Sequence, residues 1–122
     1  IIMRVDNFQQ VLEDLNSSSS DIEASALISN DGLVIASALP AGIDDDRVGA
    51  MSAALLSLGD RAGRELARGS IDRIMIQGEK GYVITTSAGD EAVLTIMAKS
   101  NAKLGLIFLD IKRAAAALAK LI

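Results

Sequence analysis

The chain has 122 residues, half of them apolar, and 12 basic against 16 acidic side chains give it a net charge of −4. This length suits one domain over residues 1–122, and with only one Tyr and two Phe its core has to be aliphatic. The lack of Cys and His excludes disulfides, Cys/His zinc sites and Ser-His or Cys-His nucleophile pairs, and the acidic balance argues against nucleic acid as a partner.

No apolar run is long enough to cross a bilayer, and the first residues lack the basic-then-apolar pattern of a signal peptide. We therefore expect a cytoplasmic protein without direct membrane insertion.

The first part of the chain predicts a helix and a hairpin. Apolar residues at positions 8, 11, 12 and 15 lie on one face of a short helix, with Asp6 as its N-cap and the serine run 17–20 after its end. Strands are expected over 22–29 and 33–39, because Asp31-Gly32 between two apolar runs is a strong hairpin signal.

A long helix is predicted over 44–68. Asp44 is the expected N-cap, and Gly69 is the expected stop. Strands follow over 71–77, 82–87 and 91–98, and a last helix starts near residue 101. The predicted order is α-β-β-α-β-β-β-α, an α/β (α+β) chain.

The 44–68 helix carries two stripes that can be buried. One is large and apolar and suits the covering of a sheet: Val48, Met51, Leu55, Leu58, Ala62 and Leu66. The other consists of small or apolar residues: Gly49, Ala53, Leu56, Gly63 and Ala67. Because an interior glycine costs a helix up to about 1 kcal/mol, two on one side suggest that another backbone comes close. We expect this second stripe to meet its own copy in a homodimer; a bend or tight packing within the chain is the alternative.

The strand at 71–77 supports the same expectation. It follows the long helix and is rich in apolar residues, and an exposed apolar edge strand invites pairing with another chain. The interface positions predicted on it are Ile71, Arg73, Met75 and Gln77.

Three arginines near the end of the long helix, Arg61, Arg64 and Arg68, are the candidates for binding a partner protein. The spacings Asp60–Arg64 and Arg61–Glu65 are also those of ordinary surface ion pairs, which is the simpler interpretation. An arginine finger supplied to a GTPase is the sharper alternative.

Catalytic, metal and nucleotide sites are not predicted. The carboxylates at 44–46 and 90–91 fall at a helix start and a turn, where acids are common for structural reasons, and no phosphate-binding loop occurs. We expect neither a cofactor nor enzymatic activity.

Four segments in the correct order resemble the Roadblock (dynein light chain) family. They are 26–37 (ALISNDGLVIAS), 50–59 (AMSAALLSLG), 77–82 (QGEKGY) and 102–106 (AKLGL). The resemblance implies a five-stranded antiparallel sheet in the order 2-1-5-4-3, with the long helix on one face and both terminal helices on the other. It also implies a dimer in which the third strands pair and the long helices pack together.

Members of this family commonly bind or regulate small Ras-like GTPases. The resemblance therefore implies a non-catalytic dimeric module that binds such a GTPase and modulates its GTP hydrolysis. A purely structural dimerisation scaffold and a small-ligand sensor are the alternatives, although the sensor would need polar groups and aromatics that are scarce here.

Overall fold

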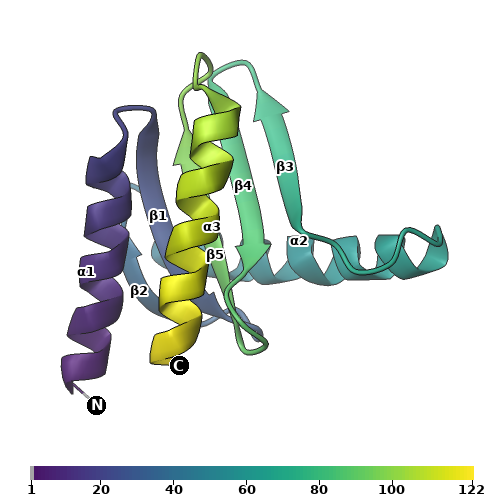
Figure 1. Cartoon of the computed structure of the whole chain (residues 1–122), viewed down its shortest axis with the longest axis horizontal. Coiled ribbons are helices and arrows are strands. Elements are labelled where there is room, and N and C mark those ends of the chain that lie inside the picture. The colour runs from purple at the N-terminus through teal and green to yellow at the C-terminus, as the bar shows by residue number, and fades with distance from the viewer. Residues whose placement is uncertain (1) are drawn as a thin grey trace.

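The computed structural model describes residues 2–122, with side chains from residue 6 onward. Its elements follow the predicted order (Figure 1): α1 (Ile2–Ser18), β1 (Ile22–Ser29), β2 (Val34–Ala38), α2 (Asp45–Glu65), β3 (Arg73–Gly78), β4 (Gly81–Ser87), β5 (Ala92–Ala98) and α3 (Leu104–Leu121). The strands form one antiparallel sheet in the order β2-β1-β5-β4-β3. Both the element order and the strand order implied by the family resemblance are confirmed.

The helices lie in two layers on either side of the sheet. Helices α1 and α3 lie side by side over one face, and α2 crosses the other face (Figure 1). The main core lies between the sheet and the α1–α3 pair and includes Leu12, Leu27, Leu94, Ile107 and Leu118. A much smaller core of Ala26, Ile28, Leu56 and Val93 holds α2. Helix α2 is therefore the less firmly embedded layer.

Local sequence signals account for several boundaries. The side chain of Asp44 accepts a hydrogen bond from the Asp46 N–H at 3.0 Å, so the predicted N-cap of α2 is confirmed. Gly32 has a φ of +91°, a conformation that favours glycine, and closes the β1–β2 hairpin as predicted.

Other boundaries differ from the prediction. Helix α1 begins at Ile2, so Asp6 lies inside the helix and is not its N-cap. Helix α2 ends at Glu65, not at residue 68, because Ala67 turns into the left-handed region with a φ of +57°. Strand β3 accordingly starts at Arg73, two residues later than predicted.

The two edge strands of the sheet, β2 and β3, differ in whether helix side chains bond to their backbone. At edge strand β2, two side chains of α1 donate to backbone carbonyls: Gln9 to Ser37 at 2.7 Å and Asn16 to Ala38 at 3.0 Å. Edge strand β3 pairs with β4 on one side and lies open on the other. Among the described residues, helix side chains therefore bond to the backbone of edge strand β2 but not to that of edge strand β3.

Candidate functional site

The burial of the two stripes of α2 differs from the prediction. Gly49, Leu56 and Gly63 are buried against their own chain. Met51, Leu58 and Leu66 of the stripe predicted to cover the sheet are instead 58%, 63% and 68% exposed. The prediction that the glycine side faces outward is therefore wrong. Of the other stripe, Val48 does pack against the small core and Leu55 is half-buried, while Met51, Leu58 and Leu66 form the open face.

Close packing within the chain explains the glycines. A side-chain carbon on Gly49 would collide with the Gly32 carbonyl in the β1–β2 turn, and one on Gly63 would collide with the Gly69 carbonyl. The backbone that these glycines admit thus belongs to the same chain, which was the alternative to a second copy. Of the other stripe members, Ala53 is half-buried and Ala67 lies beyond the end of the helix.

Helix α2 is longer than the sheet is wide at this point. In Figure 1 its C-terminal half continues well past β3, and the chain folds back along it to begin that strand. Leu58, Ala62 and Leu66 are exposed on this projecting half. The chain thus holds out a helical arm whose apolar outer side, with Leu58, Ala62 and Leu66, stays exposed.

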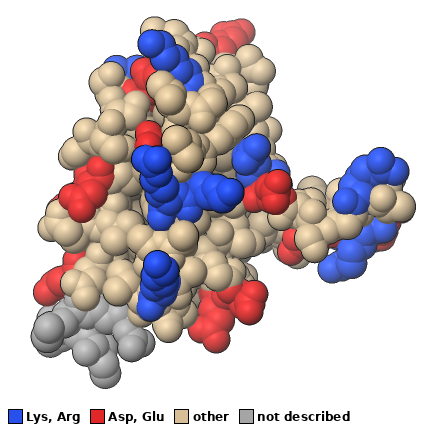
Figure 2. Space-filling view, viewed as in Figure 1, with Lys and Arg blue, Asp and Glu red and all other residues tan. Residues whose placement is uncertain are grey.

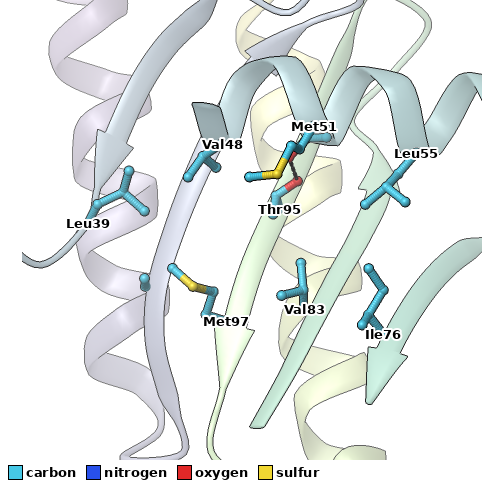
Figure 3. A pocket seen from close by; sticks show the side chains of 10 residues that line it. Leu39, Val48, Met51, Leu55, Ile76, Val83, Thr95 and Met97 are labelled. Atoms are coloured by element: carbon cyan, nitrogen blue, oxygen red, sulfur yellow. Dashed lines mark hydrogen bonds between the residues drawn. The ribbon is translucent and has the colours of Figure 1, made fainter. Parts of the chain in front are cut away.

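An apolar hollow lies beside α2 on the same face of the sheet (Figure 3). It has a volume of about 140 Å³. Its walls come from β1, β3, β4, β5, the residue after β2, and α2, where Val48 and Leu55 are half-buried. The lining residues are Ala24, Leu39, Val48, Met51, Ser52, Leu55, Ile76, Val83, Thr95 and Met97. The exposed arm and the hollow together form one apolar surface along α2.

The polar atoms at the bottom of this hollow are already paired. The Thr95 hydroxyl donates to Ser52 of α2 at 2.8 Å and lies 3.0 Å from the Thr85 hydroxyl. All three side chains are buried. This hydroxyl chain fixes α2 to the sheet and leaves an apolar surface for contact, which favours a protein partner over a polar small molecule. The alternative of a small-ligand sensor gains no support from these groups.

Strand β3 presents the candidate interface residues along the open edge. Arg73, Met75 and Gln77 are exposed and alternate with Ile74 and Ile76, which face α2 and the hollow. Ile71 precedes the strand, is half-buried and packs against the small core. The structure therefore places three of the four predicted edge residues within the strand and one just before it.

The candidate arginines lie at the free end of α2. In Figure 2 blue side chains gather at the end of the projecting arm. Arg61 is paired with Glu65 at 2.9 Å, and Arg68 donates to the Leu66 carbonyl at 3.0 Å. Arg61, Arg64 and Arg68 are all exposed, so this end of the arm is a cationic surface.

Sequence reasoning missed the hollow and its hydroxyl chain. Thr85 and Thr95 look like ordinary strand residues, and Ser52 like a polar position on an amphipathic helix. The available signal was the polar residue on the buried side of strand 91–98, which needs a hydrogen-bond partner when it is covered.

Two further classes of site are absent from the described part of the chain. Within residues 2–122 no helix combines the length and the apolar character that a membrane span requires. No group of three or more acidic residues among the described side chains is arranged to hold a metal ion.

Comparisons with known proteins agree with this geometry. A sequence model of the Roadblock/LC7 domain matches residues 8–98. Uncharacterized protein MJ0310 of Methanocaldococcus jannaschii is 39% identical over 106 residues, which cover 87% of this chain and 91% of that protein. Among solved structures, MglB of Myxococcus xanthus gives a TM-score of 0.88 at 21% identity, covering 97% of this chain and 92% of that one. The gliding protein MglB of Thermus thermophilus gives 0.84 at 23% identity, covering 97% and 90%.

Proposed function

Since the chain belongs to the Roadblock/LC7 domain family, we propose that it is a non-catalytic homodimeric module that binds a small Ras-like GTPase and modulates its GTP hydrolysis. We place it in the cytoplasm as a single domain without a cofactor. The observation that carries this proposal is the apolar arm of α2, which leaves its own sheet beside an open strand edge.

A second copy of the chain is the partner that the arm fits best. Exposed Leu58 and Leu66 need apolar surface, and the hollow beside α2 offers it on each copy. A two-fold axis beside β3 would lay each arm over the other copy's sheet and join the two open edges at the same time. The proposed interface therefore consists of Met51, Leu55, Leu58 and Ala62 of α2, in place of the glycine stripe. It still includes the edge residues of β3.

The two ends of α2 are also electrically complementary. Asp44, Asp45 and Asp46 stand at its start, and Arg64 and Arg68 stand at or just beyond its end. Two copies of α2 lying antiparallel would bring each acidic end toward a basic end. This charge arrangement favours antiparallel over parallel pairing.

The mass of the protein in solution tests the dimer. We expect light scattering to give twice the chain mass of 12.7 kDa. Leu58→Asp should give a folded monomer, because a charge without a partner would be buried at the interface at a cost of about 3 kcal/mol or more.

The control is Leu106→Asp, a substitution at a comparably exposed leucine of α3 on the opposite face of the sheet. Circular dichroism should show native helix content in both variants, since neither leucine is buried in the single chain. A wild-type monomer, or a Leu58→Asp dimer, would rule out the proposed pairing.

The GTPase role is tested by single-turnover GTP hydrolysis. A small Ras-like GTPase from the same organism is mixed with and without the chain, and we expect the hydrolysis rate to change when the chain is present. Arg64→Ala should weaken binding by about two- to fivefold, as expected for an exposed charge at a protein interface. Binding with no effect on the rate would instead assign the chain to the scaffold class.

A further inference from the structure

The face of the sheet opposite α2 carries a second groove, between α3 and strand β3. It has a volume of about 560 Å³ and mixes apolar and charged walls. Phe108 and Leu109 contribute the apolar part, and Arg73 and Lys112 contribute cations. This groove lies outside the α2 surface that the proposed function uses.

The groove is built around a fixed arginine. The Arg73 guanidinium lies 4.0 Å above the centre of the Phe108 ring, a cation–π contact that ties β3 to α3. At the start of the strand, the Thr86 hydroxyl donates to the Asp72 carbonyl at 2.6 Å. The floor and one wall are therefore held by contacts within the chain, while Leu109 remains 44% exposed and Met75 41% exposed.

The charge of the groove differs from that of the whole molecule. Two cations, Arg73 and Lys112, face one acid, Asp72, among its lining residues, whereas the chain as a whole carries −4. Neither cation forms an ion pair with any described side chain. In Figure 2 blue side chains gather near the middle of this face. The groove thus offers free positive charge beside exposed apolar side chains.

Pairing of two chains through β3 would turn this groove into a trough. Arg73, the first residue of β3, is the strand residue that lines each groove, so a two-fold axis beside β3 would bring the two grooves to opposite ends of one pair of strands. Helix α3 lies over β4 and β5, where Ile107 and Ile111 meet Ile84 and Leu94. The two α3 helices would then stand about four strand spacings apart, roughly 20 Å.

One further helix fits that space. Packed helices lie about 8–10 Å apart, so a helix between the two α3 helices would contact both and rest on Met75 and Gln77 of the paired strands. A flat bilayer could not reach this floor, because both α3 helices would stand above it. Nucleic acid would lack the stacking aromatics that bind single strands, since Phe108 is already covered by Arg73.

We propose that this trough binds one acidic amphipathic helix of a partner protein per dimer. The inference rests on the proposed dimer, but it adds a second docking surface on the face opposite α2. The apolar side of the helix would meet Met75 and Leu109, and acidic residues on both flanks would face Arg73 and Lys112 of each copy. The module would then connect a GTPase on one face to an acidic partner on the other.

Binding of a designed peptide to the purified protein tests this proposal. The probe is a fluorescently labelled helix of about 18 residues, roughly 27 Å long, with a leucine stripe flanked by glutamates. We expect its anisotropy to rise to saturation at one peptide per two chains. A peptide with lysines in place of the glutamates should bind at least about tenfold more weakly.

Three variants of the chain locate the site. Lys112→Glu reverses one charge in each half of the trough and should weaken peptide binding about tenfold, while Lys120→Glu, farther along α3 and outside the groove, should not. Leu58→Asp keeps each groove but abolishes the proposed dimer, so it should also lose tight binding. Native mass is measured for each variant.

The outcomes separate this inference from the proposed function. A wild-type dimer that does not bind the peptide, binds two peptides, or ignores Lys112→Glu would overturn the trough and leave the dimer standing. A wild-type monomer would overturn both. Lys112-dependent sedimentation with phosphatidylserine vesicles, without peptide binding, would reassign the face to membranes and end the proposal.

Discussion

Gly49 and Gly63 occupy positions of α2 where a side-chain carbon has no room. At Gly49 the obstacle is the backbone carbonyl of Gly32, which cannot move without shifting the β1–β2 turn. We expect Gly49→Ala to lower the free energy of unfolding by about 1–3 kcal/mol in urea denaturation, despite the better helix propensity of alanine.

Gly59→Ala is the matched control in the same helix. Its side-chain carbon would meet only the side chains of Ile71 and Ile74, whose ends can rotate away. The expected change in the free energy of unfolding is within about 1 kcal/mol. Equal losses at Gly49 and Gly59 would show that backbone contact does not set the requirement for glycine.

Ala67 holds a position that glycine usually fills. The Arg68 N–H donates to the Gly63 carbonyl at 2.7 Å and the Ala67 N–H to the Arg64 carbonyl at 3.2 Å, which together form a Schellman motif. Its φ of +57° strains any residue with a side chain. Ala67→Gly should therefore raise the free energy of unfolding by about 0.5–1 kcal/mol, after allowance for the greater freedom of glycine in the unfolded chain.

Ala62→Gly should instead lower the free energy of unfolding. Ala62 is exposed within α2, where glycine costs about 1 kcal/mol relative to alanine. Thermal denaturation of both variants should give a higher midpoint for the change at residue 67 and a lower one for the change at residue 62. A lower midpoint for both would mean that Ala67 is not under strain.

For single residues, the sequence predicts contacts between residues that are close along the chain, but not contacts between residues that are far apart along it. Asp44 and its bonded N–H are two residues apart, so the cap could be identified from the chain itself. Gly49 indicated close approach of a backbone, but the approaching atom is 17 positions away, at Gly32 (49 minus 32). Which backbone would come close depended on the tertiary fold.

Helix α2 is held to the sheet by a chain of hydroxyl groups as well as by apolar contacts. Thr95 lies at the centre, bonded to Ser52 on one side and Thr85 on the other. Thr95→Val keeps the shape but leaves two buried hydroxyls without that partner, so we expect a loss of about 1–3 kcal/mol in the free energy of unfolding.

Ser52→Ala tests the same chain at its end. The Thr85–Thr95 bond survives in this variant, so the loss should be smaller, about 0.5–1.5 kcal/mol. Chemical denaturation of both variants distinguishes a connected network from independent bonds. A larger loss for Ser52→Ala than for Thr95→Val would contradict the central role of Thr95.

The elements themselves were largely predictable, but the orientation of α2 was not. Hairpin turns and strand alternation are local, and they gave the sequence of helices and strands. Both stripes of α2 are apolar or small, and periodicity alone cannot tell which one turns inward. The two glycines decided it, because only their side could approach the neighbouring turns closely.

At the level of the whole molecule, the two edges of the sheet differ in what covers them. Gln9 and Asn16 of α1 donate to carbonyls of β2, whereas β3 is open. We expect the double substitution of both residues by alanine to expose β2 and to produce species larger than a dimer, detected by light scattering at rising concentration.

The control is Gln10→Ala. In the wild-type chain the Gln10 side chain donates to Asp14 within the same helix and not to the sheet. This variant should keep the size of the wild-type protein. Unchanged size in the double variant would mean that the two amides contribute to stability without protecting the edge.

The contrast between the edges limits how far self-association can go. In the language of polymer chemistry, a chain with one reactive terminus is monofunctional: it couples once and then stops growth. We expect the amides of Gln9 and Asn16, which donate to carbonyls of β2, to block the second terminus. Coupling through β3 would consume the first, so the product would be a finite pair and not a fibril.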